Sequence, residues 1–124
     1  GTKMELMRRA LVSDLSPDFL SDLARGPNTE VDLREQLTEL GIRISAFLER
    51  VAPRVAVLKA GGVCLQEIFA EHEVPPPVLA HRLLTQWFAK ADALGLATIP
   101  EPASAAHMLM GGLQSRIMQH HFFG

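Results

Sequence analysis

The sequence has 124 residues, a formal net charge of −2, an isoelectric point near 6.2 and 48% hydrophobic residues. This length fits one domain over residues 1–124, and the charge balance leaves too little basic surface to hold DNA by its phosphates. The single cysteine, Cys64, excludes an intrachain disulfide and is typical of a reducing compartment. No apolar run reaches the roughly 20 residues that cross a bilayer, and no signal peptide is recognisable, so we expect a cytoplasmic chain without membrane contact.

The first helix is expected over residues 2–14. Thr2 can cap its first turn, and Glu5, three residues later, completes a capping box. Its apolar stripe is predicted at Leu6, Ala10 and Leu11.

A second helix is expected to begin at Ser16, Pro17 and Asp18, where a capping serine precedes a proline at the first helical position. It should end at Gly26, since a glycine followed by a proline stops a helix.

The longest helix is predicted over residues 29–52 and would be a central strut about 35 Å long. Its apolar residues recur at spacings of three and four: Leu33, Leu37, Leu40, Ile44, Phe47, Leu48 and Val51. Pro53 is expected to break or kink it. A short helix from Arg54 and another over residues 62–71 should follow.

The last two helices are predicted over residues 76–94, with a stop at Gly95, and from Glu101 or Pro102 to His121. Because their connection is short, they should be antiparallel neighbours. Both carry more apolar residues than a single buried stripe needs. The sequence thus predicts an all-α antiparallel bundle with apolar surface left for a partner or a ligand.

Gly111 and Gly112 fall in the middle of the last helix. One glycine inside a helix costs about 1 kcal/mol relative to alanine. The pair therefore predicts the close approach of another helix.

The start of the chain resembles the junction that ends the helix-turn-helix head of TetR-family transcriptional regulators. Gly1, Thr2, Lys3 and Leu6 match that junction. The resemblance implies that residues 1–14 link the chain to a DNA-binding head of about 45 residues upstream of Gly1, through which operator DNA is bound. Lys3 then corresponds to the lysine that lies against the DNA backbone in that family; a solvated lysine of the first helical turn is the alternative.

Residues 83–117 are similar to the closing helix pair of the same family. The resemblance implies that the two last helices pack on their copies in a second subunit, as a four-helix homodimer interface. The interface candidates are Leu84, Ala91, Ala106, Met110, Gly111, Gly112, Leu113 and Ile117.

A ligand cavity for a small apolar or aromatic effector is expected in the same chain. Its candidate lining combines aromatic and Met side chains with polar groups that could orient a ligand. These residues are Phe47, Phe69, Trp87, Phe88, Met108, Gln66, His81, Gln86 and His107. Trp87 and Phe88 are neighbours on a helix, so one could enter the dimer seam while the other faces the pocket; both could equally be core.

The function implied is effector sensing and dimerisation in a TetR-like repressor, where a bound ligand changes the spacing of two DNA-binding heads. A helical homodimeric interaction module without a small-molecule ligand is the alternative. We expect no enzyme, because no catalytic motif or phosphate loop occurs. No cofactor or metal site is expected either: His120 and His121 point about 100° apart on a helix, and Cys64 is expected to be a small core residue.

Overall fold

The computed structural model describes residues 2–13, 19–70, 74 and 76–123. In these residues the chain is all-helical and has no strand, which confirms the predicted fold class. The helices are α1 (Lys3–Ser13), α2 (Phe19–Arg25), α3 (Leu33–Ala60), α4 (Leu65–Ile68), α5 (Pro76–Ala93) and α6 (Pro102–Phe123).

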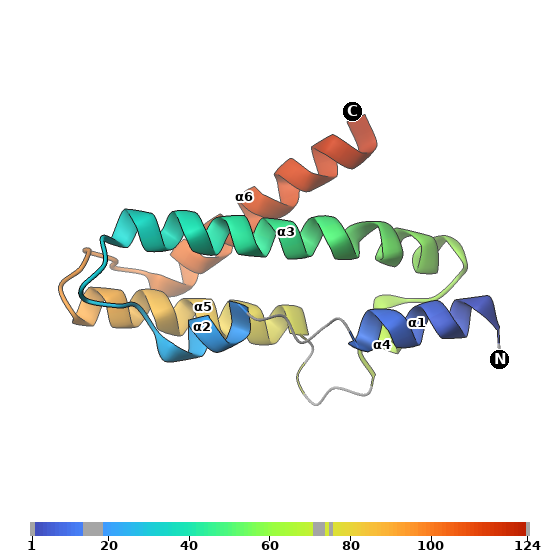
Figure 1. Cartoon of the computed structure of the whole chain (residues 1–124), viewed down its shortest axis with the longest axis horizontal. Coiled ribbons are helices and arrows are strands. Elements are labelled where there is room, and N and C mark those ends of the chain that lie inside the picture. The colour runs from blue at the N-terminus through green and yellow to red at the C-terminus, as the bar shows by residue number, and fades with distance from the viewer. Residues whose placement is uncertain (1, 14–18, 71–73, 75, 124) are drawn as a thin grey trace.

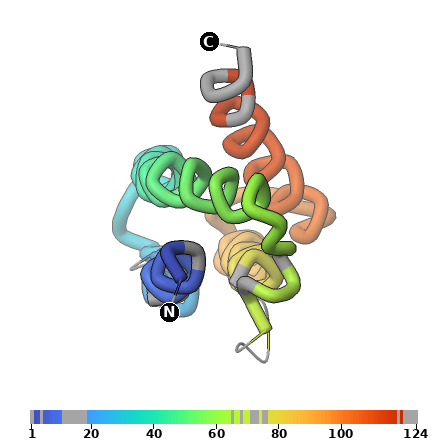
Figure 2. Tube along the Cα trace, turned by 90° about the vertical axis from the view of Figure 1, so that its right-hand side faces the viewer, coloured from blue at the N-terminus to red at the C-terminus, as the bar shows by residue number. Residues whose placement is uncertain are grey.

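Helix α3 is the central strut and runs along the whole body of the molecule (Figure 1). It contacts α1, α2 and α6, while α5 packs chiefly against α6 and also contacts α2. The predicted antiparallel pairing of the last two helices is confirmed, since α5 and α6 share the most extensive contact in the fold. Helix α6 crosses α3 at a steep angle, and its C-terminal half projects beyond the other helices (Figures 1 and 2).

Local signals place several helix ends where the sequence predicts them. The backbone N–H of Glu5 donates to Thr2 Oγ1 at 3.1 Å, which caps α1. Gly26 and Gly95 follow α2 and α5 with left-handed φ angles of 82° and 75°. The start predicted at residues 16–18 lies outside the described residues.

The long helix begins four residues later than predicted, at Leu33. Asn28 Oδ1 accepts a hydrogen bond from the Glu30 N–H, so the chain makes a turn before the helix. The Gln36 side chain then clamps this turn by bonding both backbone groups of Asn28 and the carbonyl of Val31. These bonds compete with a first helical turn over residues 29–32.

The predicted break at Pro53 is wrong, because α3 continues through it to Ala60. A proline inside a helix loses one backbone hydrogen bond, at a cost of about 3 kcal/mol. The Pro53 ring is exposed, while Val51 and Leu58 on either side are buried. Burial on both sides of the proline therefore holds the helix together.

The helix predicted over residues 62–71 is reduced to the single turn of α4. Gly62 has a φ of 89°, and the N–H of Val63 turns back to the carbonyl of Leu58. This C-terminal cap of α3 holds the chain out of helical geometry until Leu65.

The main core lies where α2, α3, α5 and α6 meet. Its buried residues are Phe19, Leu23, Leu40, Ile44, Ala80, Leu84, Trp87, Phe88, Ala91 and Ala106. A second cluster forms around Val51 and Leu58, where Met7, Phe47, Val55, Val63 and Phe69 pack. The chain thus has two apolar centres along α3, one toward each end.

The apolar stripe predicted for the first helix is placed on the wrong side. Met7 packs against the second cluster, whereas Leu6 is 65% exposed and Ala10 is also exposed. Leu11 lies outside the side chains described. The short, mixed pattern of α1 could not distinguish Leu6 from its neighbour Met7.

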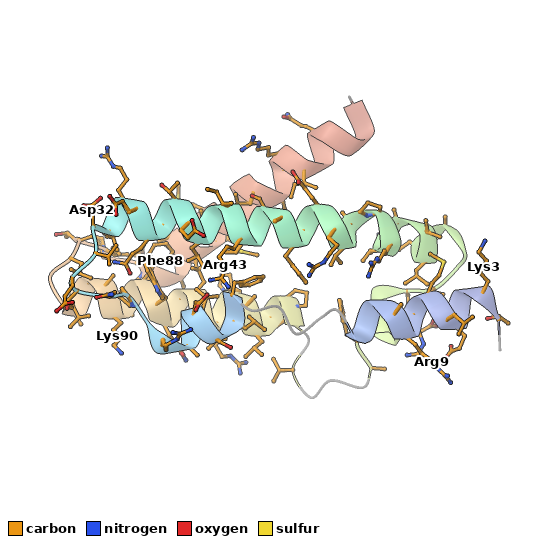
Figure 3. All side chains as sticks on the ribbon, in the orientation of Figure 1. Lys3, Arg9, Asp32, Arg43, Phe88 and Lys90 are labelled. Carbon is orange, nitrogen blue, oxygen red and sulfur yellow. The ribbon has the colours of Figure 1, made fainter. Side chains whose placement is uncertain are left out.

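An acidic side chain ties α2 to the central strut. Asp22 forms one ion pair with Arg25 of α2, at 2.5 Å, and another with Arg43 of α3. Arg43 lies between the two helices in Figure 3. Because Arg25 of α2 and Arg43 of α3 share the Asp22 carboxylate, this contact orients α2 on α3.

Alanine substitutions at Gly26 and at Gly41 should change the free energy of unfolding in opposite directions. A Cβ at Gly26 would need a positive φ and would meet Lys90 Cδ at 2.8 Å, so Gly26→Ala should lower the free energy of unfolding by about 1–2 kcal/mol. Gly41 is inside α3 with open space around it, so Gly41→Ala should raise that free energy by about 0.5–1 kcal/mol. Urea unfolding followed by circular dichroism measures both. A loss at Gly41 similar to that at Gly26 would contradict this difference.

Candidate functional site

The surface of α6 that faces away from α3 and α5 is uncharged. We define the α6 outer face as the exposed residues Ser104, Met108, Gly111, Gly112 and Ser115. Their spacing of three and four residues keeps them on one side of the helix. Arg116 is the one Lys, Arg, Asp or Glu in the 22 residues of α6, and Met108 is 74% exposed. A helix on the surface of a monomer usually carries charges on such a side.

The glycine pair of α6 has open space around it among the described residues. A Cβ added at Gly111 or Gly112 would have nothing within 4 Å among the described residues. The close helix approach that the sequence predicts at these glycines is therefore not made by another helix of the described chain.

The predicted interface residues separate into inner and outer groups. Leu84, Ala91 and Ala106 are fully buried within the chain, and Ile117 is 6% exposed. Met110 and Leu113 are half-buried against the main core. Gly111 and Gly112 are the members of this set that are exposed. Because Leu84, Ala91 and Ala106 are already fully buried within the chain, their burial needs no second subunit.

In the described part of the chain, the predicted pocket residues lie in several separate places. Trp87 and Phe88 both lie in the main core, with their rings edge to face at 5.6 Å, so both point inward. Phe47 packs edge to face on Phe19 at 5.4 Å and, with Phe69, borders the second cluster. The remaining members lie nearer the surface: His81 is half-buried, and Gln66, Gln86, His107 and Met108 are exposed.

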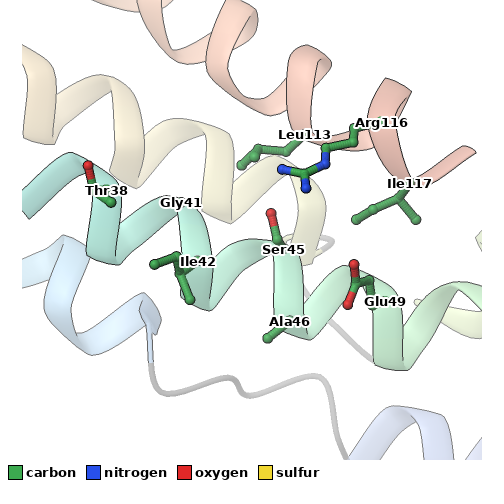
Figure 4. Close-up of a pocket in the computed structure, with 9 residues that line it drawn as sticks. All are labelled: Thr38, Gly41, Ile42, Ser45, Ala46, Glu49, Leu113, Arg116 and Ile117. Atoms are coloured by element: carbon green, nitrogen blue, oxygen red, sulfur yellow. The ribbon is translucent and has the colours of Figure 1, made fainter. Parts of the chain in front are cut away.

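A groove opens where α6 diverges from α3, and sequence reasoning missed it. It has a volume of about 430 Å³ and is lined by Thr38, Gly41, Ile42, Ser45, Ala46 and Glu49 of α3 with Leu113, Arg116 and Ile117 of α6. In Figure 4 the Arg116 guanidinium points from α6 across the groove toward α3. Small residues at Gly41 and Ser45, one turn apart on one side of α3, were the signal that could have revealed it.

A second groove of about 370 Å³ lies between the beginning of α1 and the segment around α4. It is lined by Thr2, Glu5, Arg8, Val63, Glu67 and Ala70. Glu5 accepts hydrogen bonds from Arg8 at 2.9 and 3.2 Å and from Arg9 at 3.2 Å. The bonds from Arg8 are the main reason why the pKa of Glu5 is lowered from its ordinary value. This carboxylate is therefore ionised at neutral pH and holds both arginines along one side of α1.

Lys3 is exposed in the first turn of α1, close to the N-terminal end of the molecule (Figure 3). Leu6, one turn further along, is exposed as well. An exposed lysine and an exposed leucine thus share the beginning of α1.

Cys64 is exposed, not buried as the sequence predicted. It follows the cap of α3 in the short segment before α4, where the chain runs along the surface. Apolar neighbours in the sequence therefore gave a misleading indication of its burial.

In the part of the chain that is described, no three His, Cys, Asp or Glu side chains come together as a metal site. None of the described helices combines the length and the apolar character needed to cross a membrane. No family model matches the sequence, and no curated protein or solved structure is significantly similar to the chain.

Proposed function

We propose that this chain is the effector-sensing and dimerisation domain of a TetR-like transcriptional repressor that acts in the cytoplasm. The observation that carries the proposal is the α6 outer face. It combines an exposed methionine, a glycine pair whose added Cβ atoms would meet nothing within 4 Å among the described residues, and an absence of charge. In the proposed dimer, close helix packing between two copies offsets the roughly 1 kcal/mol that each glycine costs in a helix.

The beginning of α1 supports the proposed link to a DNA-binding head. Lys3 and Leu6 are both exposed there, and the first turn lies at one end of the molecule (Figure 1). A preceding helix-turn-helix domain would cover Leu6 and bring Lys3 close to the DNA backbone. Lys3 would add a phosphate contact, which fixes position but does not read sequence.

The α3–α6 groove is the proposed effector site. Its volume of about 430 Å³ lies in the range of small-molecule pockets. A small apolar or aromatic molecule between the two helices would favour one angle of α6 relative to α3. Because α6 also forms the proposed dimer seam, the ligand would shift the spacing of the two heads through its differential affinity for the two states.

A pair of matched variants tests the effector site. A compound that raises the melting temperature of the wild-type chain should lose this effect in Ala46→Phe, which fills the groove. Ala56→Phe, at an exposed position of α3 outside the groove, should retain it. Equal stabilisation of both variants would place the ligand elsewhere.

The repressor itself is tested with the full-length protein on its operator. The same compound should weaken operator binding at least about tenfold, a typical size for coupling between two sites. A compound that binds the sensor chain and leaves operator affinity unchanged would contradict the proposed mechanism.

A homodimeric interaction module without a ligand is the second candidate. The α6 outer face supports it equally well, because a dimer seam requires no effector. The two candidates differ in the thermal-shift experiment, because the interaction module predicts that no class of small organic compound stabilises the chain.

A further inference from the structure

Two histidines that are distant in the sequence meet across the α5–α6 pair. The imidazole of His81 on α5 lies edge to face with that of His107 on α6, with ring centroids 6.2 Å apart and planes 71° apart. His81 is half-buried and His107 is exposed. The contact therefore lies at the boundary between the packed helices and the solvent.

The imidazole nitrogens of both residues are open to a ligand. In the described residues, neither ring donates or accepts a hydrogen bond, and neither forms an ion pair. The nearby Thr85 hydroxyl donates to the His81 backbone carbonyl at 2.8 Å and is thus occupied. Imidazole nitrogens are donors that suit Zn²⁺, Cu²⁺ and Ni²⁺ in proteins.

We propose that His81 and His107 together bind a divalent transition-metal ion of the Zn²⁺ class. With metal–nitrogen bonds of about 2.0–2.1 Å, two imidazoles in a tetrahedral shell would have their centroids about 5 Å apart. The observed 6.2 Å must therefore close by about 1 Å. Because His107 is exposed, a change in its χ1 torsion would bring the two rings closer.

The remaining metal positions are filled by water. No described group of three His, Cys, Asp or Glu side chains surrounds the pair, so the protein supplies two ligands. Such an ion links α5 to α6 and stabilises the folded chain, because the two imidazoles are held together only in the folded state. The inference is independent of the proposed repressor function, since it needs neither a dimer nor an effector.

The test uses the untagged chain with ZnCl₂ and NiCl₂ in a buffer without chelators. We expect either ion to raise the melting temperature by about 3 °C or more and to bind at one ion per chain in titration calorimetry. MgCl₂ should have no effect, since Mg²⁺ prefers oxygen ligands and binds few imidazoles.

Single variants decide which residues hold the ion. His81→Ala and His107→Ala should each weaken Zn²⁺ binding at least tenfold, with circular dichroism confirming that both remain folded. The double variant of His120 and His121 to alanine, which removes the adjacent histidines near the end of α6, is the control and should bind as the wild type does. Absence of Zn²⁺ binding to the wild type, or unchanged binding in both single variants, would overturn the proposal.

Discussion

Replacing Leu84 with alanine should lower the free energy of unfolding by about 2–5 kcal/mol. Leu84 is completely buried in the main core, where α5 packs against α6 and α2. The substitution removes buried methyl groups and leaves a cavity that close-packed neighbours such as Trp87 and Phe88 can fill only partly. Urea unfolding followed by circular dichroism and by the fluorescence of Trp87 measures the loss.

The matched control is Leu6→Ala, which removes the same atoms from a side chain that is 65% exposed. It should change the free energy of unfolding by no more than about 0.5 kcal/mol. The loss at Leu84 should also be the same at every protein concentration, because its burial is internal to the chain. A loss that decreases on dilution would instead place Leu84 in a subunit interface, as the family resemblance implies.

Helix ends with a local chemical signal were predictable from the sequence. The Thr2 cap, the stop at Gly26 and the stop at Gly95 each depend on one residue and its immediate neighbours. The connection after α5 is stabilised in the same local way, since Asp92 Oδ1 accepts a hydrogen bond from the Ile99 N–H at 3.0 Å. A short, rigid connection of this kind leaves the following helix few directions other than antiparallel.

Helix boundaries that depend on tertiary contacts were not predictable in this way. Pro53 is a strong local breaker, yet burial of Val51 and Leu58 on either side keeps α3 continuous. Conversely, the apolar residues after Gly62 indicate a helix, but the cap at the end of α3 leaves only the short α4. At Pro53 tertiary burial overrides a local breaker, whereas after Gly62 the cap of the preceding helix overrides the apolar pattern of the residues that follow.

Of the candidate site, only the unusual composition of α6 was predictable from the sequence. Gly111 and Gly112 marked the helix correctly as unusual, but α6 is apolar on several sides, so its pattern could not separate inward from outward residues. Trp87 and Phe88, for which the sequence left two directions open, both point into the core. The meeting of His81 and His107 depends on how α5 crosses α6, and no spacing within one helix reveals it.

Met108→Asp should convert the proposed dimer into a monomer. Met108 is 74% exposed in the single chain, so the substitution should leave the fold intact. In a dimer built on the α6 outer face it would bury an unpaired carboxylate, which raises the dissociation constant by about 100-fold or more. Light scattering coupled to size-exclusion chromatography measures the mass over a concentration series. Leu6→Asp, with a similar exposed leucine on α1, is the control and should remain dimeric.

Gly111→Ala, on the same α6 outer face, should stabilise the monomer and weaken the dimer. In the monomer the added Cβ has open space, so helix propensity should raise the free energy of unfolding by up to about 1 kcal/mol. In the dimer the same methyl group would push the two α6 helices apart and weaken association by about tenfold. These opposite signs are expected only if a second helix approaches the glycines closely. If Gly111→Ala stabilises the chain and leaves the dissociation constant unchanged, the two copies meet through another surface, and the α6 glycines need a different explanation.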